Sequence, residues 1–332
     1  MYVHDPALLY GVAAQQRTGE FKMDTDSTNP GFRMDTLDAF SRQSKLYLES
    51  TAKVDFGALS HPGKVRKNNE DHYFVSRLGR SIEPLLTNIP QNLLPDRLAE
   101  YGYGMLVADG MGGAAAGEVA SRMAISLLVK LVVDTAKWGR HIDELEAEAL
   151  MERMENYYTT IHSELVRQGE IDPSVAGMGT TLTVAYSFCS DLFVAHVGDS
   201  RAYLFREGQL RQLTRDHTVA QKLADKGDIP QEAVSKHRLR HILTNVIGGH
   251  SGPLVTDIQQ FHLADCDRLL LCSDGLTDMV DDVVIADVLD KIEPPQEACE
   301  KLLDLALNAG GKDNITIILA NYAFSEAAAD RE

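Results

Sequence analysis

The chain has 332 residues, of which 44% are hydrophobic and 24% are charged, and its formal net charge is −17. This composition is ordinary for a globular protein and allows a sizeable core in one large domain or two small ones. Non-specific nucleic-acid binding needs clustered Lys and Arg. The acidic balance therefore argues against nucleic-acid partners and against an anionic membrane surface.

Along the chain, residues 1–50 are mostly polar and predict an N-terminal extension, partly disordered, with a short helix near 35–48. Residues 51–322 are denser in apolar runs and predict one folded domain, and residues 323–332 predict a tail. The longest apolar stretch, at 123–133, is too short to span a bilayer, and no basic segment precedes ALLYGVAA near the N-terminus. The 4 cysteines form no C-x-x-C pair, so we expect a cytoplasmic protein without membrane insertion.

Apolar runs predict the strands of this domain at residues 71–77, 103–109, 180–188, 192–198, 201–213, 267–273 and 314–322. The run at 201–213 is expected to be a hairpin, because Glu207-Gly208 is a turn pair between two alternating stretches. Helical spacing predicts helices at residues 114–136, 143–168 and 296–309. Consecutive strands and separate helices suggest an α+β fold with antiparallel sheets covered by helices.

The stretch LVADGMGG at residues 106–113 ends an apolar run on Asp109 and continues with glycines. The carboxylates next to the ends of other predicted strands are Glu70, Asp71, Asp199, Asp274 and Asp313. Each one alone is best explained as a turn residue in water. Together they predict a carboxylate cluster at one rim of a sheet sandwich.

Clustered carboxylates repel one another unless a cation neutralises them, and oxygen ligands select hard ions such as Mg²⁺ or Mn²⁺ over zinc. The glycines after Asp109 let the backbone approach closely, so the carbonyl of Gly110 could also be a ligand. Arg66, four residues before Glu70, carries a guanidinium that suits a phosphate oxyanion. An ordinary surface arginine is the simpler explanation of that residue taken alone.

The chain resembles the metal-dependent Ser/Thr protein phosphatases of the PPM family (protein phosphatase type 2C), and most closely the bacterial branch. The matching motifs, in the family's order, are RKNNED (66–71), VADGMGG (107–113), GMGTTLTVA (177–185), AHVGDSRAYL (195–204), LTRDHT (213–218), LLCSDGLTD (270–278) and GKDNIT (311–316). The resemblance implies a four-layer αββα sandwich of two antiparallel β-sheets flanked by helices. A dinuclear metal site is expected at one end of the sandwich.

The resemblance also implies a role for each residue of the cluster. Asp109 would bridge two metal ions, and Gly110 would supply its carbonyl. Asp274 and Asp313 would bind the first ion and Glu70 the second, while Asp199 would share a third, weaker site with Asp274. Asp71 would orient metal-bound water, and Arg66 would bind the phosphate. Animal members have a His where this chain has Met111, so the expected proton source is a metal-bound water, with His61 or His72 as alternatives.

The implied function is metal-dependent hydrolysis of phosphoserine and phosphothreonine in proteins, in opposition to a cognate Ser/Thr kinase. A hydroxide bridging two Mn²⁺ or Mg²⁺ ions would attack phosphorus directly, without a covalent intermediate. Two alternatives stay open: a phosphoprotein-binding pseudophosphatase, and a dedicated regulator phosphatase in a sigma-factor partner-switching pathway. The complete carboxylate set argues against the first. Arg66 argues against the second, because members of that branch typically lack it.

In this family, residues 214–253 would form a flap beside the active site. The flap contains the basic run KHRLRH at 236–241. We hypothesise that Lys236, Arg238 and Arg240 receive phosphorylated or acidic substrate segments, the alternative being a solvated helix face. His237 and His241 have the i, i+4 spacing of zinc ligands, but the Glu of H-E-x-x-H is missing and we interpret the spacing as coincidence.

Two other classes of protein match short stretches. GMGGAA at residues 110–115 fits a dinucleotide-binding fingerprint with Asp134 as the ribose ligand. However, Asp109 would repel the pyrophosphate and no second strand is predicted before Asp134. Residues 221–234 loosely fit a helix-turn-helix, which the net charge of −17 disfavours.

Overall fold

The structure is a computed structural model that describes residues 52–82, 86, 98–112, 116–135, 144–249 and 252–324. Contacts divide the chain into two units, Met1–Gln43 and Ser44–Glu332, and every described residue belongs to the second. The predictions for residues 1–50, and for the tail beyond Phe324, lie outside the described residues.

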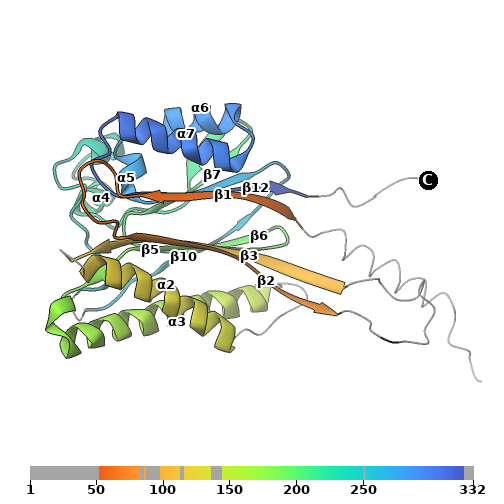
Figure 1. Cartoon of the computed structure of the whole chain (residues 1–332), viewed down its shortest axis with the longest axis horizontal. Helices are drawn as coiled ribbons and strands as arrows, with labels where there is room; N and C mark the ends of the chain where they lie inside the picture. Colours follow the sequence, from red (N-terminus) through yellow and green to blue (C-terminus); the bar gives the residue numbers. More distant parts are fainter. Residues whose placement is uncertain are drawn as a thin grey trace, which may run out of the picture. The chain divides into compact units, whose positions relative to one another are not determined.

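Two antiparallel β-sheets stack face to face (Figure 1). Within the described residues, the first sheet comprises, in spatial order, β1 (Lys53–His61), β12 (Ile315–Ala323), β11 (Arg268–Cys272), β7 (Arg201–Arg206) and β8 (Gln209–Gln212). The second comprises β10 (Asp257–His262), β6 (Asp191–Val197), β5 (Leu182–Phe188), β3 (Leu98–Met111), β4 (Gly179–Thr180) and β9 (Ile247–Gly248), with β2 (Asp71–Ile82) paired to β3.

Helices cover the outer face of each sheet (Figure 1). Helices α6 (Asp282–Lys291) and α7 (Pro295–Asn308) lie over the first sheet, and α2 (Ala116–Thr135) and α3 (Glu144–Ile171) lie over the second. Short elements complete the described residues: α4 (Val219–Asp225), α5 (Asp274–Thr277), and the 3₁₀ turns η2 (Pro173–Val175) and η3 (Gln231–Lys236). The predicted four-layer αββα sandwich is confirmed.

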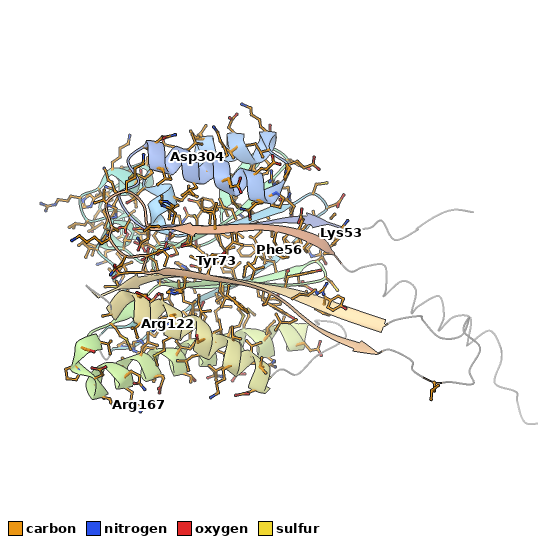
Figure 2. All side chains as sticks on the ribbon, viewed as in Figure 1. Lys53, Phe56, Tyr73, Arg122, Arg167 and Asp304 are labelled. Atoms are coloured by element: carbon orange, nitrogen blue, oxygen red, sulfur yellow. The ribbon has the colours of Figure 1, made fainter. Side chains whose placement is uncertain are left out.

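Strand β12 explains the layering, because alternate residues of a strand point to opposite faces of its sheet. Ile315, Ile317 and Leu319 pack with the core under α6 and α7. Ile318, Ala320 and Tyr322 pack in the core between the two sheets. A strand covered on both faces reads as a nearly continuous apolar run. In Figure 2, Phe56 lies between the sheets, whereas Arg167 and Asp304 lie on the outer helices.

Several element predictions differ from the structure. The predicted strand 180–188 is split at Thr181, whose N–H donates to the Asp109 carbonyl at 2.9 Å and whose hydroxyl accepts from the Asp109 N–H at 2.9 Å. Strand β3 continues beyond Asp109 to Met111, where it pairs with β4. Strands β1 and β10 and helix α6 were not predicted. Both strands are sheet edges with few fully buried residues, and the sequence of β10 alternates weakly. In β1, Val54, Phe56 and Ala58 do alternate and pack against the core between the sheets.

The dinucleotide-binding alternative is wrong, because Asp134 lies inside α2 instead of at a strand end and β3 is antiparallel to both β2 and β5. The helix-turn-helix alternative is wrong as well. Helix α4 is followed by the 3₁₀ turn η3, where a second α-helix would be needed. Among the described helices, none has the length and apolar character needed to cross a membrane.

Candidate active site

The register of two strands brings the first acidic residues together. Asp71 on β2 lies directly opposite Asp109 on β3. The carbonyl of Glu70 accepts from the Gly110 N–H at 3.2 Å, and the N–H of Glu70 donates to Asn314 Oδ1 at 2.8 Å. These contacts join the start of β2 both to the end of β3 and to the loop before β12.

The first sheet contributes two more acids from adjacent strands. Asp274 begins α5 immediately after β11, and Asp313 directly precedes Asn314 at the start of β12. Ser273 Oγ donates to Asp71 Oδ2 at 2.7 Å, so the two sheets meet through a direct hydrogen bond. The predicted carboxylate cluster at one rim of the sandwich is therefore assembled from both sheets.

Close backbone packing explains why a glycine follows Asp109 directly. A Cβ atom on Gly110 would lie 2.1 Å from the carbonyl oxygen of Gly117, in the first turn of α2. A Cβ atom on Gly117 would lie 2.9 Å from Glu70 Oε2. The beginning of α2 therefore packs directly against the carboxylate site, and only glycine permits this approach at both positions.

The carboxylates interact unfavourably with one another. Burial raises the pKa of Asp71 to about 6. Burial, and then the charge of Asp216, raises the pKa of Asp199 to about 7. The pKa values of Asp109 and Asp274 lie well above the usual range, because these partly buried side chains are desolvated and surrounded by other carboxylates. Such a set is stable at neutral pH only when protons or cations offset the negative charge.

The donor set fits hard divalent cations. Asp71 Oδ1 and Asp274 Oδ1 are buried and accept no hydrogen bond from the described residues. Buried polar atoms in folded proteins nearly always have a partner, so unpaired carboxylate oxygens in a cluster indicate a ligand. The donors are carboxylate and carbonyl oxygens, the ligand types of Mg²⁺ and Mn²⁺.

Arg66 lies at the edge of this cluster. Its Nη2 is 2.7 Å from Asp313 Oδ2, and its side chain is 55% exposed. The hydrogen bond to Asp313, and then the charge of that carboxylate, raises the pKa of the guanidinium. Arg66 is therefore charged, accessible to solvent, and held beside the carboxylates, and its role in binding phosphate stays a prediction.

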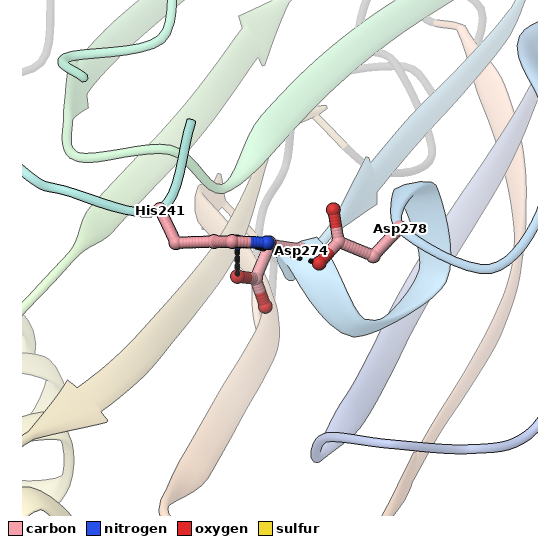
Figure 3. Close-up of side chains that lie close together, drawn as sticks. All are labelled: His241, Asp274 and Asp278. Carbon is pink, nitrogen blue, oxygen red and sulfur yellow. Dashed lines mark ion pairs between the residues drawn. The ribbon is translucent and has the colours of Figure 1, made fainter. Parts of the chain in front are cut away.

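A second group of ligand atoms combines one residue of the predicted flap with two residues at α5. His241, Asp274 and Asp278 each offer one such atom, and these three atoms all lie within 4.8 Å of one another (Figure 3). His241 Nδ1 is 3.4 Å from Asp278 Oδ2 and 3.9 Å from Asp274 Oδ2. Asp278 was not predicted as a site residue, although the spacing D-G-L-T-D on a helical turn signals it. The predicted coincidence of His237 and His241 did not place His241 at the carboxylates, because its position depends on how residues 214–249 fold.

The structure separates the three basic flap residues. Arg240 Nε is 3.5 Å from Asp278 Oδ1, so this side chain faces the carboxylate site. Lys236 and Arg238 are exposed to solvent. The exposure of Lys236 and Arg238 agrees with the solvated alternative, although η3 ends at Lys236 and the residues after it form turns instead of a helix face.

The two predicted alternative proton sources have local structural contacts. His61 Nδ1 accepts from the Gly63 N–H at 2.9 Å. His72 Nδ1 lies 2.9 Å from Ser121 Oγ, and burial lowers its pKa. Met111, which occupies the position of the animal histidine, is 39% exposed and cannot transfer a proton.

Comparisons with known proteins identify the family of the chain. A profile described as "Protein phosphatase 2C" matches residues 96–307. The chain is 35% identical over 268 residues to the serine/threonine phosphatase stp of Listeria monocytogenes serovar 1/2a, covering 81% of this chain and 96% of that protein. It is 34% identical over 272 residues to the serine/threonine protein phosphatase PstP of Mycobacterium tuberculosis H37Rv, covering 82% of this chain. The match covers 45% of PstP, so the chain spans about half the length of that relative.

Solved structures give the same result. The crystal structure of M. tuberculosis PstP has a TM-score of 0.65 and 34% identity, and the match covers 81% of this chain and 98% of that one. The catalytic domain of PstP in complex with two manganese ions has a TM-score of 0.64 and 33% identity, covering 82% and 100%. The chain therefore belongs to the protein phosphatase 2C family, and the resemblance to bacterial PPM phosphatases is confirmed.

Proposed function

We propose that the protein hydrolyses phosphoserine and phosphothreonine in other proteins, in opposition to a Ser/Thr kinase, with Mn²⁺ or Mg²⁺ bound at the carboxylate cluster. The observation that carries the proposal is the convergence of mutually repelling carboxylates from both sheets beside the exposed guanidinium of Arg66. Relatives named serine/threonine phosphatases, and the manganese complex of a related catalytic domain, support it.

The residues that would hold two cations are Glu70, Asp109, the carbonyl of Gly110, Asp274 and Asp313. A third, weaker site would use Asp199 and Asp274. Asp278 and His241, whose ligand atoms lie close to Asp274, could add ligands to this third site. Bound cations would lower the pKa of a coordinated water and offset the charge of the phosphoryl group.

The remaining roles belong to side chains that do not need to bind a cation. Arg66 would hold two phosphoryl oxygens with its planar fork, since its partner Asp313 becomes a cation ligand. Asp71, with one oxygen hydrogen-bonded to Ser273 and the other unpaired, would orient the attacking water. Met111 stands in place of the histidine of animal relatives, so the chain has no general acid at this position. The leaving oxygen would take its proton from water, and a ring nitrogen of His241 lies within 4.8 Å of carboxylate oxygens of Asp274 and Asp278.

The test is hydrolysis of an aryl phosphate and of a phosphothreonine peptide with Mn²⁺, with Mg²⁺ and with EDTA, using wild type, Asp274→Asn and Asp304→Asn. Asp304 is an exposed acid on α7 and serves as the matched control (Figure 2). We expect metal-dependent turnover that disappears only in Asp274→Asn. Stoichiometric metal binding without turnover would identify a pseudophosphatase, and absence of metal binding would contradict the site itself.

A further inference from the structure

The flap has a stem that is built like a short antiparallel bridge. We define the flap stem as residues 217–219 and 242–245. The Val219 N–H donates to the Ile242 carbonyl at 2.8 Å, and the Thr244 N–H donates to the His217 carbonyl at 2.8 Å. The two halves of the stem are thus held together by main-chain bonds at the point where the flap leaves the sandwich.

The imidazole of His217 adds a side-chain connection at the same point. Nδ1 accepts from the Gly198 N–H at 3.2 Å and from Asn245 Nδ2 at 3.0 Å, and Nε2 lies 3.0 Å from Asp257 Oδ2. A main-chain N–H can only donate, so Nδ1 carries no proton and Nε2–H donates to Asp257. One neutral tautomer satisfies all three contacts, and Asp257 on β10 fixes the orientation of the ring.

Gly198 has little freedom to move. Its φ is +117°, and a Cβ atom there would lie 2.5 Å from the side chain of Thr181. Its carbonyl accepts from the His217 N–H at 2.6 Å and lies 3.0 Å from His196 Nε2. The residue that precedes Asp199 is therefore held on both its N–H and its carbonyl, and His217 supplies one contact to each.

Asp199 links this arrangement to the active site. The Asp199 side chain is buried, and its negative charge helps to raise the pKa of Asp274. The charge of Asp278 in turn helps to raise the pKa of Asp199. At the other end of the flap, Arg240 and His241 contact Asp278. Stem and distal flap thus both reach the same group of carboxylates.

We propose that His217 is a positioning residue for the hydrolysis. Its Nδ1 atom fixes the position of the flap stem relative to the Gly198–Asp199 turn. The position of the flap and the position of the Asp199 carboxylate therefore depend on the same side chain. The inference rests on the proposed function, because it takes Asp199 as a cation ligand and the flap as part of the substrate site.

Two amide substitutions separate the contacts of the ring. In His217→Asn, the side-chain oxygen lies near the former Nδ1 position and can accept from Gly198. In His217→Gln, the amide reaches towards Asp257 and leaves the Gly198 N–H without its acceptor.

We expect His217→Asn to keep turnover of a phosphothreonine peptide within about threefold of wild type. His217→Gln should lower turnover by about 10–100-fold and should need more Mn²⁺ for its half-maximal rate, as is usual for residues that orient ligands. His262→Gln, at an exposed histidine of the same strand β10, is the matched control and should stay near wild type. Equal losses in the Asn and Gln variants would overturn the proposal.

A double-mutant cycle with Asn245→Ala tests the shared atom. If Nδ1 couples both stem halves, the loss in His217→Gln/Asn245→Ala should be clearly smaller than the product of the single losses. Independent, multiplicative losses would show that the ring acts only as local packing.

Amide hydrogen exchange separates this inference from the proposed function, because it needs neither substrate nor metal. The Gly198 and Thr244 amides should exchange at least about tenfold faster in His217→Gln than in His217→Asn, in folded protein without metal. Unchanged exchange would contradict the positioning role even if the wild type is an active phosphatase. Faster exchange in His217→Gln, together with a wild type that lacks turnover, would support the positioning role while the proposed function fails.

Discussion

Asp71 illustrates how one residue can indicate chemistry before any ligand is known. Its side chain is 4% exposed, and one of its oxygens accepts from Ser273 while the other has no described partner. Burying an unpaired carboxylate oxygen is costly, so the site is most stable with a water or a cation beside this atom. The same environment raises the pKa of Asp71 to about 6.

Arg66 is the residue whose loss should affect phosphate binding most directly. We expect Arg66→Ala to lower kcat/KM for a phosphothreonine peptide by about 10²–10³-fold, because it removes charge stabilisation of the phosphoryl oxygens. Arg66→Lys should recover only part of this, since it restores the charge without the planar fork. Steady-state kinetics would check it, with Arg167→Ala on the outer face of α3 as control. Equal kinetics in Arg66→Ala and wild type would exclude the phosphate-binding role.

His196 should make stability depend on pH. Burial, and then the neighbouring His217, lowers its pKa to about 4, against about 6.5 in the unfolded chain. Between these values the unfolded chain binds a proton that the folded chain does not bind. The free energy of unfolding therefore decreases as the pH is lowered, by roughly 2 kcal/mol from pH 7.5 to pH 5. Urea unfolding at both pH values should show a smaller decrease for His196→Gln. Identical decreases in both proteins would contradict this assignment.

At the scale of elements, the site depends on which strands are neighbours. Antiparallel pairing of β2 with β3 places Asp71 opposite Asp109, and pairing of β11 with β12 brings the segments of Asp274 and Asp313 side by side. The flap adds residues that follow η3. Because Arg240 contacts Asp278 while Lys236 and Arg238 are exposed, these three basic residues should not be equivalent.

The exposed pair of flap residues should affect only large substrates. We expect Lys236→Ala/Arg238→Ala to leave aryl phosphate hydrolysis unchanged and to lower kcat/KM for an acidic phosphoprotein by about 3–10-fold at low salt, since rim charges mainly steer encounter. The control is Lys291→Ala, an exposed lysine on α6 that pairs with Asp287. Phosphoprotein kinetics that do not change would remove these two residues from the substrate surface.

For the whole molecule, the sandwich holds repelling carboxylates from both sheets at one end. Cations that bind only the folded state should therefore stabilise it, by about 2.7 kcal/mol at a concentration of 100 times Kd. We expect Mn²⁺ to raise the Tm of wild type and of Asp304→Asn, and to raise that of Asp109→Asn much less. Thermal unfolding with Mn²⁺ and with EDTA measures this. A full Mn²⁺ response in Asp109→Asn would show that the ion binds elsewhere.

The sequence alone determined the family, the layered fold class and most of the carboxylates. These follow from local patterns: apolar runs such as β12, which is buried on both faces, and acids placed where such runs begin or end. The edge strand β10 was not predictable in the same way, because its sequence carries little periodic signal, whereas the alternation of Val54, Phe56 and Ala58 in β1 was a usable signal.

Only the tertiary structure decided which distant residues meet. The contact of His241 with Asp278 and the contacts of His217 with Gly198, Asn245 and Asp257 join segments that no spacing rule connects. Likewise, the unpaired oxygens of Asp71 and Asp274 become evident only after both sheets have packed. The physical reason is that periodicity and motifs are properties of neighbouring residues, whereas hydrogen-bond partners and desolvation depend on how separate elements come together.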